Sequence, residues 1–236
     1  MKPQREPQLW IVDPSVRSAE EQGVAEILRD WPGASRVFRP ALRPGDVPAG
    51  AEGYETDGVV LLGSAASVHD CLPWIPALEA WLRPVLTGER RIPLFGVCFG
   101  HQLIAHLAGG RVGYLDARRT KAVGVESTEL AGGRLLEGAQ SLRVVVSHRE
   151  EVQQVPAGYR VTARRPRSPI DGLEHETLPI YSFQFHPEAR EQFAREAGID
   201  PAAIDARLRA DGRRLLRAFL EEVWSRTPGG SALGPG

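Results

Sequence analysis

Short apolar runs alternate with amphipathic helical patterns in the first half of the chain, and this alternation limits the folds open to it. Residues 9–12, 59–62 and 93–97 are brief apolar runs that suit strands buried on both faces. Between them, residues 19–31 and 74–87 place apolar side chains at helical spacing. Because strands that alternate with helices form a parallel sheet covered by helices, we predict an α/β fold.

The second half of the chain has a different pattern. Residues 142–146, 159–163 and 180–185 are strand-like, and Gly and Pro predict turns at 156–158 and 171–172. These strands follow one another without intervening helical patterns. We therefore place the parallel strands in the first half.

A long helical pattern occupies residues 200–226. Asp200 is the predicted N-cap and Pro201 the first helical residue, while Gly212 is expected to divide the segment into two helices. No linker long enough to separate two domains precedes it, so we predict one domain over residues 1–226. The remaining residues, 227–236, are predicted to form a mobile tail.

The composition excludes several classes of protein. Lys and Arg number 29 against 30 Asp and Glu, so no basic excess exists to bind nucleic acid or an anionic membrane. Two cysteines, Cys71 and Cys98, are too few for a disulfide scaffold or a four-cysteine zinc site. No apolar run approaches the roughly 18 residues of a membrane span, and residues 9–12 are too short for a signal peptide. We expect a cytoplasmic protein.

A cysteine stands between two glycines at the point where a buried strand runs into a helix, in Phe-Gly-Val-Cys-Phe-Gly-His-Gln at residues 95–102. This arrangement is a nucleophile elbow with cysteine in place of serine. The tight turn holds Cys98 in a strained backbone conformation, and the helix N-terminus favours a thiolate. A buried cysteine without chemistry is the alternative interpretation.

A later strand ends in His186-Pro187-Glu188. A cysteine nucleophile needs a base within hydrogen-bond reach, and the base needs a third group that orients it. His186 and Glu188 are two residues apart, so both side chains can face one site from the strand end. A surface loop without chemistry would explain the tripeptide alone, but together with the elbow it indicates a triad.

The segments 96–105 and 184–188 resemble the class I (triad) glutamine amidotransferase family, and in particular stand-alone proteins similar to the glutaminase domain of GMP synthetase. Residues 57–64 are similar to the oxyanion strand and loop of that family, and residues 145–158 are similar to its Ser-His segment. The resemblance extends over most of the chain. It implies a flavodoxin-like single domain with a mostly parallel open sheet, flanking helices and a nucleophile elbow.

The resemblance also implies a role for each matching residue. Cys98 would attack the side-chain amide of glutamine and form a γ-glutamyl thioester, His186 would transfer protons, and Glu188 would orient the imidazole. Backbone amides of Phe99 and of the 63–64 loop would bind the oxyanion. The residues implied to line the substrate or oxyanion site are Gly63, Ser64, Phe99, Gln102, Ser147 and His148.

Two positions depart from the family's pattern. Ser64 stands where a second glycine is common, and a serine there would be strained if the position requires a positive φ. Arg149-Glu150 stands where Gly-Asp commonly follows the Ser-His pair, at the position of a contact to the glutamine α-amino group.

Other polar segments have two interpretations each. The basic clusters 118–121 and 164–167 are expected to be solvated, with a docking patch for a partner as the alternative. Residues 69–71 are expected to form a solvated loop rather than a lid. His101, next to the elbow, is expected to support the site rather than take part in the chemistry.

The sequence contains neither a Walker-type phosphate loop nor a His-Glu-x-x-His metal pattern, so we predict no cofactor and no metal. The length leaves no room for a synthetase domain. Ammonia released from glutamine is therefore expected to reach an acceptor on a separate synthetase or acceptor subunit. The alternatives are a γ-glutamyl hydrolase acting on a small γ-glutamyl amide or peptide, and a non-catalytic interaction subunit that keeps the fold.

Overall fold

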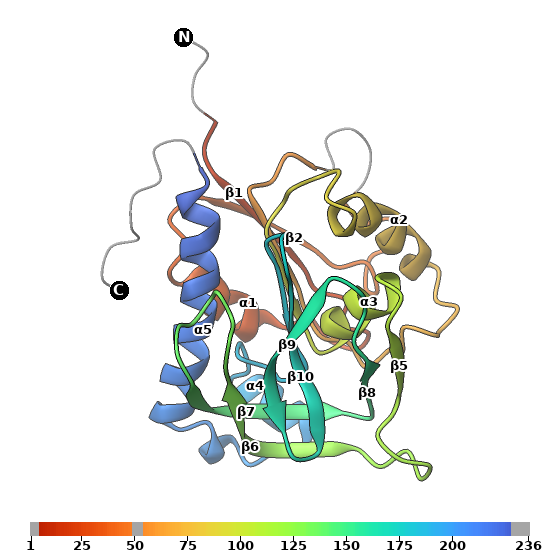
Figure 1. Cartoon of the computed structure of the whole chain (residues 1–236), viewed down its shortest axis with the longest axis vertical. Helices are drawn as coiled ribbons and strands as arrows, with labels where there is room; N and C mark the ends of the chain where they lie inside the picture. The colour runs from red at the N-terminus through yellow and green to blue at the C-terminus, as the bar shows by residue number, and fades with distance from the viewer. Residues whose placement is uncertain (1–4, 49–53, 228–236) are drawn as a thin grey trace.

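A nine-stranded mixed sheet forms the centre of the protein, in the order β2-β1-β3-β4-β11-β10-β9-β6-β7. A computed structural model describes residues 5–48 and 54–227 of the chain (Figure 1). The strands of this sheet are β1 (Gln8–Val12), β2 (Ala34–Phe38), β3 (Gly58–Leu61), β4 (Leu94–Val97), β6 (Ala122–Leu130), β7 (Gln140–His148), β9 (Tyr159–Arg165), β10 (Ser168–His175) and β11 (Ile180–Phe183). A separate small sheet pairs β5 (Arg111–Tyr114) with β8 (Glu150–Gln154).

Helices cover both faces of the parallel half of the sheet, which consists of β2, β1, β3, β4 and β11. The helices are α1 (Glu21–Leu28), α2 (Trp74–Leu86), α3 (Phe99–Leu107), α4 (Glu191–Ala197) and α5 (Ala206–Ser225). Figure 1 shows α5 and α2 on opposite sides of the sheet. The predicted α/β fold is therefore confirmed, but the parallel strands are not confined to the first half of the chain, because β11 pairs in parallel with β4. None of the helices in the described residues is long and apolar enough to span a membrane.

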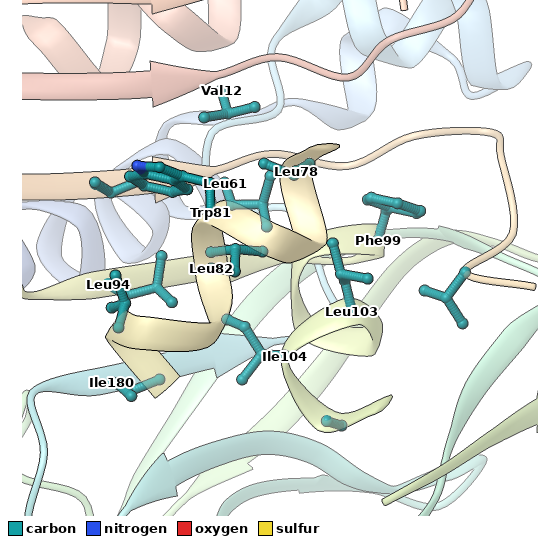
Figure 2. Close-up of a cluster of buried hydrophobic side chains, with 14 of the residues drawn as sticks. Val12, Leu61, Leu78, Trp81, Leu82, Leu94, Phe99, Leu103, Ile104 and Ile180 are labelled. Atoms are coloured by element: carbon teal, nitrogen blue, oxygen red, sulfur yellow. The ribbon is translucent and has the colours of Figure 1, made fainter. Parts of the chain in front are cut away.

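Alternate residues of the parallel strands build the two cores. On one face, Leu61 and Leu94 pack among side chains of α2 and α3 such as Leu82 and Leu103, as Figure 2 shows. On the other face, Val60 packs with residues of α1 and α5. Because each fully buried aliphatic side chain stabilises the fold by about 1.5–3 kcal/mol, these two layers hold the parallel strands rigidly in place.

The antiparallel half continues the same sheet through β10, β9, β6 and β7. The turn predicted at residues 171–172 is wrong, because β10 runs through both residues with a bulge. Gly172 serves packing there: a Cβ on it would lie 2.8 Å from side-chain atoms of Ala163 and Phe183.

The C-terminal helical segment begins later than predicted. Asp200 and Pro201 start a 3₁₀ turn at Pro201–Ala203, whereas α5 begins at Ala206 with Asp205 as its N-cap. The interruption predicted at Gly212 is absent, since α5 is continuous through it. Of the tail predicted at 227–236, residues 228–236 lie outside the described part of the chain.

Gly212 has a packing role instead. A Cβ at this position would lie 2.3 Å from the carbonyl oxygen of Pro187. Only glycine lets the helix approach the backbone that closely. The helix α5 is therefore seated directly against the loop that carries His186 and Glu188.

Candidate active site

Cys98 lies at the turn between β4 and α3, as the glycine pattern predicts. Its backbone has φ 50° and ψ −98°, a region that non-glycine residues rarely adopt. A Cβ on Gly100 would lie 2.3 Å from the carbonyl oxygen of Leu61, so the first turn of α3 packs directly on β3. The strained backbone predicted for an elbow is confirmed.

His186 and Glu188 follow β11 in a loop held by backbone contacts. The His186 amide donates to the carbonyl of Val145 on β7, at 2.9 Å. The Nδ1–H of His186 donates to Oε1 of Glu188 at 2.8 Å, and both side chains are buried. The other carboxylate oxygen of Glu188, Oε2, is buried without a hydrogen-bond partner in the described residues.

The thiol and the imidazole meet because β4 and β11 are parallel neighbours whose carboxyl ends share one edge of the sheet. A Cβ on Gly63 would lie 2.7 Å from Cε1 of His186 and 3.4 Å from Cβ of Cys98. Glycine is thus needed where the loop after β3 passes both side chains.

A cavity of about 490 Å³ opens over these residues. Its lining includes the following predicted site residues: Gly63, Ser64, Cys98, Gln102, Ser147, His148, His186 and Glu188. The remaining predicted residue, Phe99, buries its ring in the core and begins α3. Its amide belongs to the first helical turn, where N–H groups have no intrahelical acceptor.

The electrostatics of the site favour a charged imidazole. Burial alone would lower the pKa of His186, but the negative charges of Glu188 and Cys98 raise it above its ordinary value. Apart from the neighbouring thiol, Nε2 of His186 has no hydrogen-bond partner among the described residues. The arrangement therefore favours a protonated imidazole beside the Cys98 thiol.

Gln184 contacts the thiol, a contact that the sequence interpretation does not include. Its Nε2 lies 3.6 Å from Sγ of Cys98, and its Oε1 accepts from Nε2 of Gln102 at 3.2 Å. Gln102 also donates to the carbonyl oxygen of Glu150 at 2.7 Å. The two-residue spacing between Gln184 and His186 is the sequence feature that could have indicated it, because such residues share a face of an extended chain.

His148 is held neutral at the cavity wall. Its Nδ1–H donates to the carbonyl of Glu150 at 3.0 Å, and its Nε2 accepts from Arg165 at 3.2 Å. Burial, followed by the charge of Arg165, lowers the pKa of His148 to about 4. The imidazole can therefore shape the pocket without carrying charge at neutral pH.

Arg165 contradicts the expectation that residues 164–167 are all solvated. It is buried and forms ion pairs with Asp171 and Glu126, both at 2.7 Å. Successive residues of a strand point to opposite faces, so Arg164 is exposed on β9 while Arg165 points inward.

Ser64 fits the loop after β3 without backbone strain. Among the described residues, the non-glycine positions with positive φ are Cys98 and Arg119, so Ser64 does not have one. The Ser64 hydroxyl donates to the carbonyl of Pro14 at 2.7 Å and accepts from the Ala66 amide at 3.1 Å. The serine side chain therefore secures the loop.

Lys121, from the predicted solvated cluster 118–121, lines the cavity. Burial and then the charges of Arg149 and Arg17 lower its pKa, while the negative charge of Cys98 raises it. Arg149 and Arg17 line the same cavity. One member of the cluster thus contributes positive charge to the site.

His101 and the segment 69–71, both singled out from the sequence, lie near the site. His101 is fully buried outside the cavity lining, with Nδ1 2.9 Å from the hydroxyl of Ser182, and burial lowers its pKa to about 3. From 69–71, Asp70 lines the cavity and Cys71 is exposed. Within residues 5–48 and 54–227, no three His, Cys, Asp or Glu side chains are grouped to hold a metal ion.

Comparison with known families matches residues 37–202 to the family model described as glutamine amidotransferase class-I. One chain of the glutamine-hydrolyzing GMP synthase of Pyrococcus abyssi is 42% identical over 101 residues, which are 42% of this chain and 53% of that protein. The corresponding chain of the Methanopyrus kandleri enzyme is 42% identical over 107 residues, 44% of this chain and 55% of that protein. Both relatives are named as subunits of the synthase. The chain thus matches about half the length of these curated relatives.

Solved structures share the fold over nearly the whole chain. A glutamine amidotransferase from Thermotoga maritima superposes with a TM-score of 0.73 at 18% identity, covering 93% of this chain and 99% of that one. A glutamine amido transferase from Methylobacillus flagellatus gives a TM-score of 0.69 at 23% identity, covering 98% and 97%. At such identities the likeness establishes the fold.

Proposed function

Because this chain belongs to the class I glutamine amidotransferase family, we propose that it hydrolyses the side-chain amide of glutamine to glutamate and ammonia. The observation that carries the proposal is the meeting of Cys98, His186 and Glu188 at one cavity, with the thiol on a strained turn at a helix N-terminus. The relatives named as glutamine-hydrolyzing GMP synthases support the choice of glutamine.

In the first half-reaction, the Cys98 thiolate attacks the amide carbon of glutamine and forms a tetrahedral intermediate. The His186 imidazolium gives its proton to the leaving nitrogen, so the C–N bond breaks and ammonia departs. A γ-glutamyl thioester then remains on Cys98. Glu188 accepts the hydrogen bond from Nδ1–H of His186 throughout the reaction. This bond fixes the tautomer that presents Nε2 to the reacting atoms.

In the second half-reaction, His186 takes a proton from water while the water oxygen attacks the thioester. The C–S bond breaks, glutamate leaves, and the imidazolium–thiolate pair is restored. In both steps the oxyanion would be bound by the amide of Phe99 and by an amide of the 63–64 loop, donors that are fixed before the reaction starts.

The charges at the cavity suit an amino-acid substrate. Lys121 and Arg149 line it together with the thiol, and both can attract the α-carboxylate of a γ-glutamyl group. Glu150 also lines the cavity and can attract the α-ammonium group in place of the aspartate that is common in the family. With the α-carboxylate and α-ammonium groups bound in this way, the side-chain amide of the substrate would point toward Cys98.

The ammonia acceptor belongs to a separate polypeptide in this proposal, since the relatives similar to this chain are named as subunits of a synthase. The second candidate function, hydrolysis of a small γ-glutamyl amide or peptide, uses the same triad. The cavity volume of about 490 Å³ supports this second candidate, because pockets of about 300–1,000 Å³ accommodate ligands larger than a single amino acid.

The test is a comparison of substrates on the purified chain. Ammonia release from L-glutamine is measured beside amine release from γ-glutamyl-glycine and a γ-glutamyl anilide, with and without a candidate synthetase partner. Faster turnover of L-glutamine supports the first function, and faster turnover of γ-glutamyl-glycine supports the second. Absence of turnover under every condition would contradict both.

Removing the base is expected to slow alkylation of the thiol. In His186→Ala, iodoacetamide should react more slowly with Cys98 near neutral pH, and the rate profile should move to higher pH. The reason is that the raised pKa of His186 keeps an imidazolium beside the thiolate, whereas an unpaired cysteine titrates near 8.5. The measurement is the alkylation rate against pH in a Cys71→Ser background, because Cys71 is an exposed thiol.

Glu188→Gln is the comparison variant. It weakens the orientation of the imidazole without deleting the base, so we expect a smaller loss than in His186→Ala. Superimposable profiles for the parent and His186→Ala would remove His186 from the triad and leave the helix N-terminus as the cause of the thiol's reactivity.

A further inference from the structure

A second buried carboxyl group lies beside the Glu188–His186 pair. Glu20, the N-cap residue of α1, is 7% exposed and lines the same cavity as Glu188. Both glutamates pack on Gly23, where an added Cβ would lie 2.9 Å from Cγ of Glu20 and 2.9 Å from Cγ of Glu188. A side chain at Gly23 would therefore overlap both glutamates, which pack against the same glycine.

Hydrogen bonds hold Glu20 in this place. Its backbone amide donates to Oδ2 of Asp13 at 2.9 Å, and its Oε1 accepts from the amide of Gly23 at 3.3 Å. Within the described residues, no Lys or Arg forms an ion pair with Glu20 or with Glu188. The two carboxyl groups are therefore buried at the cavity wall without a lysine or arginine partner, and the positive charge that acts on Glu20 is that of His186.

One proton shared between the two carboxyl groups resolves this arrangement. Two adjacent carboxylates cannot both ionise easily, so one of them keeps its proton near neutral pH. Burial, followed by the charge of Glu188, raises the pKa of Glu20 to about 7. The buried Oε2 of Glu188, without a partner among the described residues, is an acceptor suited to that proton.

We propose, building on the function proposed above, that Glu20 is a positioning residue of the triad, whose neutral carboxyl group donates a hydrogen bond to Oε2 of Glu188. This bond fixes Glu188 while Oε1 accepts from His186. When Glu20 ionises, the bond is lost and the two carboxylates repel each other. The orientation of His186 then weakens, and the reactivity of Cys98 falls on the alkaline side of neutrality.

Glu20→Gln separates this role from a merely structural one. The amide keeps an oxygen for the Gly23 N–H and has a permanent donor for Glu188, so the variant should keep its reactivity above pH 7. The ionisable groups that act on Glu20 are Glu188, His186 and, on α4, Glu196, and Asp13 accepts from the Glu20 amide. The other ionisable side chains that line the same cavity are Arg17, Asp70, Cys98, Lys121, His148, Arg149 and Glu150. All remain in the variant, so the ratio of wild-type to variant rates isolates the titration of Glu20.

The experiment measures two rates at each pH: kcat/KM for L-glutamine, and alkylation of Cys98 by iodoacetamide in a Cys71→Ser background. Both ratios of wild type to Glu20→Gln should be constant below pH 7 and fall by about tenfold above it, the effect of one hydrogen bond to a charged group. Glu21→Gln is the matched control: Glu21 pairs with Arg39 and its side chain is 64% exposed. This variant should follow the wild type.

The alkylation arm needs no substrate, so it tests Glu20 even if the chain does not hydrolyse glutamine. A ratio that is independent of pH would overturn the proposal, whether the variant is as reactive as the wild type or uniformly less reactive. A break in the ratio near pH 7 that also occurs with Glu21→Gln would overturn it too.

Discussion

Alanine at Cys98 is expected to lower glutamine turnover by at least about 10⁴-fold, the consequence of removing the nucleophile from a catalytic triad. Without the sulfur no thioester can form, and the remaining groups can only orient substrate and polarise its carbonyl. The measurement is ammonia release under saturating glutamine, with thermal unfolding recorded on the same samples. Cys71→Ala, at the exposed thiol, should keep full activity.

Two further outcomes make this prediction specific. More than a few per cent of residual activity in Cys98→Ala would exclude the thioester mechanism. The inactive variant Cys98→Gly should be more stable than Cys98→Ala by about 1 kcal/mol, because glycine adopts a positive φ without strain. An alanine variant as stable as the glycine variant would mean that the turn at φ 50° costs little.

Arg165→Met is expected to lower the free energy of unfolding by about 3–5 kcal/mol, the usual effect of removing one partner of a buried ion pair. Arg165 and Asp171 are completely buried as side chains, and methionine would leave the carboxylate of Asp171 without its partner. The lost bond to Nε2 of His148 would also loosen the cavity wall. Urea-induced unfolding measures the change.

The neighbouring arginine is a matched control. Arg164 is exposed and donates to the carbonyl of Pro169, so Arg164→Met should stay within about 0.5 kcal/mol of the wild type. Replacing both members of the fully buried pair, as in Arg165→Met with Asp171→Leu, should recover part of the loss, because the only carboxylate then left without Arg165 is the partly exposed Glu126. Equal stabilities for the two single variants would contradict the assigned role of Arg165.

The inner parallel strands β1, β3, β4 and β11 can be predicted because they are buried on both faces, whereas the edge strand β2 is largely exposed and has no continuous apolar run. Apolar runs such as 59–62 are unambiguous, and β3 (Gly58–Leu61) agrees closely with that prediction. The antiparallel half is harder, since β6 carries glutamates and exposed positions along Ala122–Leu130. The short helix α4 buries only Ala194 and so has no apolar stripe to detect.

Some residues of the candidate site can likewise be predicted from the sequence, and others cannot. The positions of Cys98, His186 and Glu188 follow from two short segments whose local geometry is encoded by glycine and proline. Glu20 and Lys121 cannot be predicted, because their surroundings depend on which distant segments pack against α1 and the cavity. The sequence indicates where the proposed triad lies, whereas the buried charges around it depend on the tertiary structure.

The central place of β11 affects the order in which the protein matures during synthesis. The strands β2, β1, β3 and β4 come from the first part of the chain and can pair as they emerge from the ribosome, because chains fold from the N-terminus. The strand β11 emerges late and must join β4 across a long sequence separation, a slow kind of contact. Until it does, Cys98 lacks His186 beside it, and α5, which packs on Pro187 through Gly212, is made later still. Cys98 and His186 can therefore meet only after the chain has been made beyond β11.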